Sequence, residues 1–338
     1  RGRLVACLLA AELSGPASGA DPFHPAAAAV LNKNHDGDPP MPVVTANGID
    51  IAYDEFGDPK APALLLIMGL GTQMIAWPVP FCEALVQRGF RVLRFDNRDI
   101  GLSTKFDHVG PVDVAGAFAK AMSGQPVDAP YTLDDMAADA VGFMDALGIA
   151  RAHVVGASMG GMIAQVVAAK YPDRTRSLVS IMSSSGAPDL PPGKPEAIGV
   201  LLAPRPDADD REKIIAHGMN VYRVIGSPGF PTSDAELRAK IEQATDRSYY
   251  PVGVGRQLVG VLASGSRVDL LKTIKVPSLV LHGADDPLVP VEAGKDTAKH
   301  IPGAKLTIIP GMGHDVAPGL VPILAEAIAE HCLAADKQ

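Results

Sequence analysis

A serine between two glycines is the first group in this chain that could do chemistry. Residues 156–160 read Gly-Ala-Ser-Met-Gly, the only G-x-S-x-G in the sequence. The apolar run before it predicts a strand over 152–156, and the segment after it predicts a helix over 159–171. A serine at such a turn must take a strained conformation that lifts its hydroxyl above the sheet edge. We therefore predict that Ser158 is a nucleophile; the alternative is a serine in an ordinary glycine-rich turn.

A serine hydroxyl attacks a carbonyl only if a base removes its proton, and an imidazole is suited to that at neutral pH. His314 is the best placed of the nine histidines, because it follows a predicted strand over 305–309 in the loop 310–314. The chain order serine, aspartate, histidine also requires a late histidine. The alternative is an ordinary loop histidine. His282 falls inside a predicted strand, where we expect it to pack or to hydrogen-bond internally.

The acid that orients this histidine should lie between the two in the chain. The segment 282–290 offers Asp285 and Asp286 after a further predicted strand. We favour Asp286, with Asp285 as the fallback and Asp189, after the preceding strand, as a third choice. Its role is to accept the imidazole N–H and so to fix the tautomer. The alternative is that both are turn residues or an N-cap for the next helix.

An acyl-transfer serine also needs donors for the oxyanion that forms on the substrate. One is the backbone N–H of Met159, directly after the nucleophile. The other is assigned to the backbone N–H of Leu70, because Gly69 and Gly71 leave the backbone there unobstructed after a predicted strand over 63–68. These glycines are equally consistent with a tight turn before a helix.

The elements that carry these residues alternate along the chain. The turn Asn47-Gly48 predicts a hairpin over 43–53. Beyond it, strands are expected over 63–68, 91–95, 152–156, 177–182, 278–282 and 305–309, and helices over 73–88, 132–147, 159–171, 291–300 and 320–333. This alternation predicts an α/β fold with a mostly parallel sheet covered by helices on both faces.

Two segments depart from this alternation of strands and helices. Residues 185–262 are rich in proline and glycine with short amphipathic pieces near 208–223 and 233–247, which predicts a helical cap inserted into a core formed by 41–184 and 263–338. Residues 1–40 form an N-terminal extension that resembles a short signal peptide and could equally be upstream sequence or a cloning remnant. Cytoplasmic localisation is favoured, with secretion or the periplasm the alternative if the extension is a signal.

Composition excludes several classes of function. Of 338 residues, 47% are hydrophobic and 20% charged, a globular balance, and the net charge of −8 is scattered, which argues against a nucleic-acid partner. No run approaches the ~20 apolar residues of a membrane span. The three cysteines have no CxxC spacing, and nucleotide and zinc motifs are absent, so no cofactor and no metal are expected. The oligomeric state is left open.

Over roughly 43–333 the chain resembles the α/β-hydrolase superfamily, because the serine turn, the acid loop 283–290 and the histidine loop 311–314 stand in that family's order. The resemblance implies an eight-stranded, mostly parallel sheet with a cap after the sixth strand. Residues 96–103 match the family's D-x-R-x-x-G-x-S loop, which is implied to support the floor of the site. The segment 94–103 and Trp77-Pro78 are similar to esterases of the anthracycline methylesterase type. Most relatives have His-Gly where this chain has Met68-Gly69, so hydrogen bonding behind the oxyanion loop should differ.

The resemblance implies a serine hydrolase. Relatives that open epoxides or displace halides carry an aspartate in place of Ser158, which argues against both activities. We predict hydrolysis of a small-molecule carboxylic ester through an acyl-enzyme. Hydrolysis of carbon–carbon bonds, perhydrolysis and thioester cleavage use the same three residues and stay open. A non-catalytic binding protein of this fold, the alternative from another class, typically lacks one of the three.

Overall fold

A computed structural model describes residues 31–32 and 41–337 of the chain. The predicted signal-like extension therefore lies outside the described residues, except for the two-residue strand β1 (Leu31–Asn32). Strands β2 (Val43–Ala46) and β3 (Ile49–Phe56) form the expected hairpin. Asn47 and Gly48 both have positive φ, at 50° and 78°, as this turn requires.

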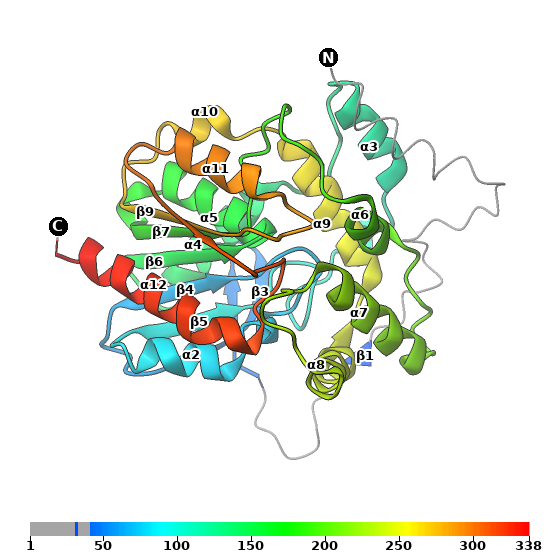
Figure 1. Cartoon of the computed structure of the whole chain (residues 1–338), viewed down its shortest axis with the longest axis horizontal. Helices are drawn as coiled ribbons and strands as arrows, with labels where there is room; N and C mark the ends of the chain where they lie inside the picture. The colour runs from blue at the N-terminus through cyan, green and yellow to red at the C-terminus, as the bar shows by residue number, and fades with distance from the viewer. Residues whose placement is uncertain (1–30, 33–40, 338) are drawn as a thin grey trace.

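The core of the fold is an eight-stranded sheet, as predicted (Figure 1). Its strands stand in the order β10-β9-β7-β6-β4-β5-β3-β2. The six parallel strands are β4 (Ala63–Ile67), β5 (Arg91–Phe95), β6 (Ala152–Ala157), β7 (Thr175–Ile181), β9 (Ser278–Gly283) and β10 (Lys305–Ile309). The strand order reverses at β4, which lies between β5 and β6. In sheets of this kind, ligands bind beyond the carboxyl ends of the strands at that reversal.

Helices cover both faces of the sheet, and each face has its own apolar core (Figure 1). Helices α2 (Val79–Val86) and α12 (Val321–Ala335) pack on one face. The other face carries α4 (Leu133–Ala146), α5 (Met159–Lys170), α10 (Val268–Leu271) and α11 (Val291–His300). Successive residues of β4 contribute to alternate cores, which is why this strand reads as a continuous apolar run. Short 3-10 turns are η3 (Asp107–Val109), η4 (Pro172–Arg174) and η5 (Pro318–Leu320).

The apolar character of α12 comes from its place in the core. The segment Pro318–Ala335 has a mean hydropathy of 1.2 and is, by length and composition, the one segment among the described residues that could cross a membrane. Its residues Leu324 and Ile328 are fully buried among side chains of α2 and the sheet. Packing in the core therefore accounts for the apolar side chains on the buried face of this helix.

The predicted helix over 73–88 is wrong in its first half. The structure has a 3-10 turn, η2 (Met74–Ala76), and α2 begins only after Pro78. Trp77 has an extended backbone, with φ −77° and ψ 99°, because the residue before a proline is disfavoured in the helical region. Its ring is buried and stacks on Phe81, with 5.2 Å between ring centroids.

Between β7 and β9 the chain forms helices that lie beyond one end of the sheet (Figure 1). They are α6 (Pro195–Leu202), α7 (Arg211–Ile225), α8 (Asp234–Arg247) and α9 (Pro251–Ser264), with the short strand β8 (Ser248–Tyr249) between the last two. Helices α7 and α8 match the predicted amphipathic pieces. Helix α9 is not predicted by amphipathic periodicity, since residues 251–260 are buried all round. It packs against α3 (Val114–Met122), which also was not predicted.

A buried histidine in β6 should make the stability of this fold depend on pH. His153 is fully buried beside Ser177 and Asp336, and burial lowers its pKa to about 4. As the pH falls below about 6.5, the unfolded chain binds a proton at this position that the folded chain does not bind. We therefore expect the free energy of unfolding to fall by about 3 kcal/mol between neutral pH and pH ~4 from this group.

Urea unfolding at several pH values tests this expectation with the variant His153→Gln as the comparison. The variant keeps a hydrogen-bonding side chain but cannot titrate, so its stability should depend less steeply on pH in this window. Other buried histidines are present in both proteins and cancel in the comparison. Parallel pH profiles would show that His153 is not the source of the dependence.

Candidate active site

Ser158 occupies a strained turn between β6 and α5. Its φ is 55° and its ψ is −121°, which a residue with a side chain rarely adopts. The two flanking glycines make the turn possible. A Cβ added to Gly156 would lie 2.0 Å from the carbonyl oxygen of Gly160, and one on Gly160 would lie 2.1 Å from the carbonyl oxygen of Ile67. The chain therefore holds the serine at the carboxyl end of β6 by close backbone approach.

The serine, the late histidine and one aspartate meet in a line of hydrogen bonds. Nε2 of His314 lies 3.0 Å from Oγ of Ser158, and Nδ1 of His314 lies 2.7 Å from Oδ2 of Asp286. The other carboxylate oxygen of Asp286 accepts the backbone N–H groups of Leu288 and Val289, at 2.9 and 2.8 Å. The acid is thus fixed by its own loop while it faces the imidazole. This arrangement can move a proton from the serine to the histidine.

The alternative acids have other surroundings. Asp285 is exposed and accepts the backbone N–H of Gly311 at 2.8 Å, which ties the acid loop to the histidine loop. Asp189 is also exposed, and the carboxylate that meets His314 belongs to Asp286. His282 is buried with Nε2 2.8 Å from the carbonyl oxygen of Val289, and burial lowers its pKa. This internal hydrogen bond is the one expected of it.

The loop after β4 lies directly against the serine. A Cβ on Gly69 would be 3.0 Å from Cβ of Ser158, so a larger residue here would have to displace its neighbour by a few tenths of an ångström. Leu70 and Met159, the two residues with candidate oxyanion donors, line the same cavity as Ser158. The side-chain amide of Asn97 donates to the carbonyl oxygen of Met68 at 2.9 Å. The structure thus brings both candidate residues to the pocket that holds the serine.

The loop over 96–103 supports the site through hydrogen bonds and buried ion pairs to neighbouring segments. Asp96 accepts the backbone N–H groups of Met74 and Leu102, at 2.8 and 2.9 Å. Arg98 forms a buried ion pair with Asp139 of α4 at 2.6 Å. A second buried pair joins Asp99 to Arg256 of α9 at 2.7 Å. The loop therefore ties the floor of the site to both α4 and α9.

An inner chamber of about 380 Å³ opens above Ser158. Its walls are mostly apolar side chains from several elements: Phe118, Met162, Met182, Ile198, Leu201, Leu202, Tyr222, Ile225, Leu258, Val261, Leu288, Val289 and Val316. Its volume falls within the range of small-molecule sites. These residues come from distant parts of the sequence and meet only in the folded chain.

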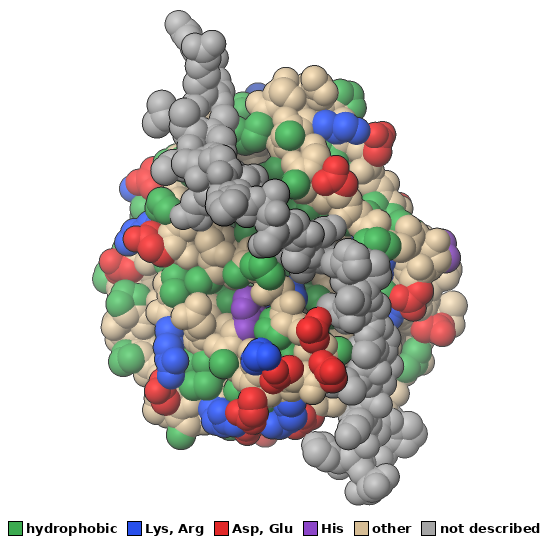
Figure 2. Space-filling view, turned by 90° about the vertical axis from the view of Figure 1, so that its right-hand side faces the viewer, with side chains coloured by type: hydrophobic (Ala, Val, Ile, Leu, Met, Phe, Trp, Pro, Cys, Tyr) green, Lys and Arg blue, Asp and Glu red, His purple; other side chains and the backbone are tan. Residues whose placement is uncertain are grey.

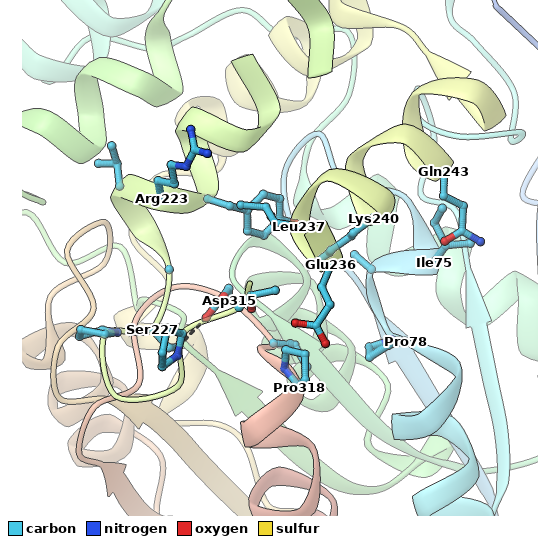
Figure 3. Close-up of a pocket in the computed structure, with 18 of the residues that line it drawn as sticks. Ile75, Pro78, Arg223, Ser227, Glu236, Leu237, Lys240, Gln243, Asp315 and Pro318 are labelled. Atoms are coloured by element: carbon cyan, nitrogen blue, oxygen red, sulfur yellow. Dashed lines mark hydrogen bonds between the residues drawn. The ribbon is translucent and has the colours of Figure 1, made fainter. Parts of the chain in front are cut away.

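An outer chamber of about 750 Å³ adjoins the inner one, and the two share Tyr222, Lys240 and Asp315 in their walls. Figure 3 shows residues of α8, including Glu236 and Lys240, facing Asp315 across it. Oδ1 of Asp315 accepts a hydrogen bond from Ser227 at 2.5 Å, and burial raises the pKa of this carboxyl. Arg223, Glu236 and Gln243 line the outer chamber and not the inner one, so the outer chamber is the more polar of the two.

Figure 2 looks onto the end of the molecule that carries the inserted helices, where hydrophobic side chains gather around a histidine near the centre of the view. The side chains of Asp and Glu and of Lys and Arg lie mainly around this apolar region.

Among the described residues, no group of three or more His, Cys, Asp or Glu side chains could hold a metal ion.

Comparison with known proteins places these features in a family. A family model described as the alpha/beta hydrolase fold matches residues 62–205. A poly(3-hydroxyalkanoate) depolymerase from Ectopseudomonas oleovorans is 31% identical over 253 residues, which cover 75% of this chain and 78% of that protein. The chain belongs to the α/β-hydrolase family.

Other relatives of this α/β-hydrolase agree with that assignment. Rhodomycin D methylesterase DnrP from Streptomyces peucetius is 27% identical over 314 residues, covering 88% of this chain and 99% of the relative. The crystal structure of the enol-lactonase from Burkholderia xenovorans LB400 has a TM-score of 0.64 at 23% identity, covering 88% of this chain and all of the other, and it shows the likeness of fold. The predicted fold and the predicted class, a hydrolase of the esterase type, are confirmed.

Proposed function

We propose that this α/β-hydrolase cleaves carboxylic esters of small molecules with Ser158 as the nucleophile. The observation that carries the proposal is the unbroken line from Ser158 through His314 to Asp286, with distances of 3.0 and 2.7 Å, at the floor of an apolar chamber. Relatives named as a methylesterase and a polyester depolymerase support the choice of ester as the bond that is cleaved.

In the proposed reaction, each of these residues has one step. Oγ of Ser158 attacks the ester carbonyl carbon while its proton passes to Nε2 of His314, and Asp286 accepts the Nδ1–H bond that holds this tautomer. The backbone N–H groups of Leu70 and Met159 stabilise the oxyanion. The intermediate then collapses as His314 protonates the leaving alcohol. Water activated by His314 hydrolyses the acyl-enzyme and restores the serine.

The two chambers suggest the shape of the substrate. The inner chamber favours an apolar group next to the scissile ester, and the more polar outer chamber leaves room for a polar group farther along the same molecule. Residues 185–262 then act as a cap over a core formed by 41–184 and 263–338. Support for this comes from Ile198 and Leu201 of α6 and Tyr222 of α7, which line the inner chamber.

The test combines covalent labelling with a panel of substrates. A fluorophosphonate should add once per chain, and peptide mapping should place the adduct on Ser158. Aryl and alkyl esters should be hydrolysed with a burst of alcohol equal to the enzyme concentration when deacylation is slow. A protein that is not labelled, or one that cleaves thioesters or carbon–carbon bonds but no oxygen ester in the panel, contradicts the proposal.

Residues of α6 should set which esters are accepted. Leu201→Phe narrows the inner chamber, so we expect kcat/KM to fall by about tenfold or more for a long-chain aryl ester and by less than about threefold for the acetyl ester. Val200→Phe, on the same helix but outside the chamber lining, is the matched control. An equal loss on every ester would show that Leu201 does not select among acyl groups.

A further inference from the structure

The side chain of Gln257 links the inserted helix α9 to two loops of the site. Gln257 is fully buried. Its Oε1 accepts the backbone N–H of Gly71 at 2.9 Å, and its Nε2 donates to the carbonyl oxygen of Arg98 at 2.7 Å. Because one partner is a donor and the other an acceptor, the orientation of the amide is defined. Gln257 lines neither chamber, so a bound substrate in either one does not meet it.

The hydrogen bond to Gly71 fixes a peptide group next to a proposed oxyanion donor. The carbonyl of Leu70 and the N–H of Gly71 belong to one planar peptide unit. Its oxygen accepts from Oγ1 of Thr72 at 3.0 Å, and its N–H is held by Gln257. Two residues before Leu70, the carbonyl oxygen of Met68 accepts from the side-chain amide of Asn97. The peptide unit between these two carries the N–H of Leu70, and its carbonyl, that of Gly69, accepts the N–H of Thr72 at 3.3 Å. The N–H of Leu70 therefore has little freedom to change direction.

Packing reinforces these hydrogen bonds. A Cβ on Gly71, whose φ is +62°, would lie 2.9 Å from Cγ1 of Val254 in α9. On the other side, Gly69 lies against Ser158. The loop is thus held between α9 and the nucleophile, and a shift of α9 would move it relative to the serine.

Helix α9 is itself anchored to the core. Arg256, next to Gln257, pairs with Asp99 at 2.7 Å, and both side chains are fully buried. A Cβ on Gly253 would lie 2.1 Å from the carbonyl oxygen of Asp99, so the helix meets this loop backbone to backbone. The amide of Gln257 therefore projects from a fixed support, as an accurate positioning group requires.

We propose that Gln257 is a positioning residue that sets the Leu70 N–H for the oxyanion, so that the inserted helix α9 contributes to the chemical step as well as to substrate selection. The inference rests on the proposed function. The side chain of Met68 offers no strong hydrogen-bond donor. Among the described residues, the side chains that bond to the backbone of residues 68–72 from outside this segment are those of Asn97 and Gln257.

The test is the variant Gln257→Met, which is similar in length but cannot bridge the two loops. We expect kcat to fall about 10- to 100-fold while KM changes by less than about threefold, because a displaced donor weakens the transition state and leaves the substrate pocket intact. An aryl trifluoromethyl ketone, which forms a tetrahedral adduct on the serine, should lose affinity by the same factor as kcat/KM.

The control is Gln165→Met, which removes another fully buried amide. Gln165 of α5 bonds to Ser180 at 3.1 Å and Arg267 at 3.2 Å and does not contact the oxyanion loop. We expect this variant to lose stability and to keep kcat.

A second pair of variants tests the inference if Gln257→Met does not fold. Val254→Ala should lower kcat severalfold, because Val254 packs against Gly71. Val259→Ala, buried in the same helix, should leave kcat unchanged.

The outcomes separate this inference from the proposed function. A wild-type protein that is not labelled on Ser158 overturns the proposed function and the inference with it. A labelled wild type together with a folded Gln257→Met variant of normal kcat overturns the inference alone. If Gln257→Met is unfolded, equal kcat values for Val254→Ala and Val259→Ala overturn it in the same way.

Discussion

The Ser158→Ala variant is expected to lose at least about 10³-fold in kcat on every ester that the wild type cleaves, because Ser158 carries the hydroxyl that bonds to the base His314. The remaining rate would come from the oxyanion donors and from binding alone. The fold should be retained, since alanine is smaller than serine and the turn is held by the close approach of Gly156 and Gly160.

The measurement is kcat for wild type and variant, together with thermal melting followed by circular dichroism. Ser180→Ala is a suitable control, because Ser180 is a buried serine of β7 bonded to Gln165 and away from the reacting groups. The fluorophosphonate adduct should disappear in Ser158→Ala and persist in Ser180→Ala. Near-normal turnover in a folded Ser158→Ala variant would remove Ser158 from the mechanism.

The sheet and the serine turn could be predicted because their signals are local. Strands buried on both faces read as short apolar runs, and β4, β6 and β9 are of this kind. The serine turn combines such a run with two glycines that close backbone contacts require. The break before Pro78 is also local, because the restriction on the residue before a proline places the start of this helix after Pro78 and not at residue 73.

The choice between adjacent acids could not be made from spacing. Asp285 and Asp286 follow the same strand, and the two side chains bond to different partners. What separates them is the bend of the loop, which places the N–H groups of Leu288 and Val289 on one oxygen of Asp286 and turns its other oxygen toward His314. That bend depends on tertiary contacts that no local sequence pattern indicates.

The inner chamber and the hydrogen bonds that support the oxyanion loop could not be predicted from the sequence either. Helix α9 is enclosed along most of its length, so it lacks the one-sided apolar pattern that reveals a surface helix. Gln257 lies 186 positions after Gly71, and no local pattern connects the two. The walls of the inner chamber come from separate elements in the same way.

Replacing the acid that holds the imidazole should be nearly as damaging as replacing the serine. We expect Asp286→Asn to lower kcat by about 10³- to 10⁴-fold. An asparagine can present its N–H₂ to Nδ1 of His314, which places the imidazole proton on Nε2 and leaves no acceptor for the serine hydroxyl. Substrate binding should change little, because the Asp286 side chain lies behind the histidine and does not line either chamber.

Asp285→Asn supplies a control that differs by one position. The amide oxygen of an asparagine can still accept the N–H of Gly311, so kcat should stay within about threefold of the wild-type value. The two variants, assayed side by side on one ester at saturating concentration, therefore separate orientation of the imidazole from support of the loop. If Asp285→Asn were the damaging change, the role of the acid would pass to Asp285, and if neither variant lost activity, Asp189 would be the next carboxylate to replace. A large loss confined to Asp286→Asn is the result that the 2.7 Å contact between Asp286 and His314 requires, because only that carboxylate fixes the tautomer able to take the serine proton.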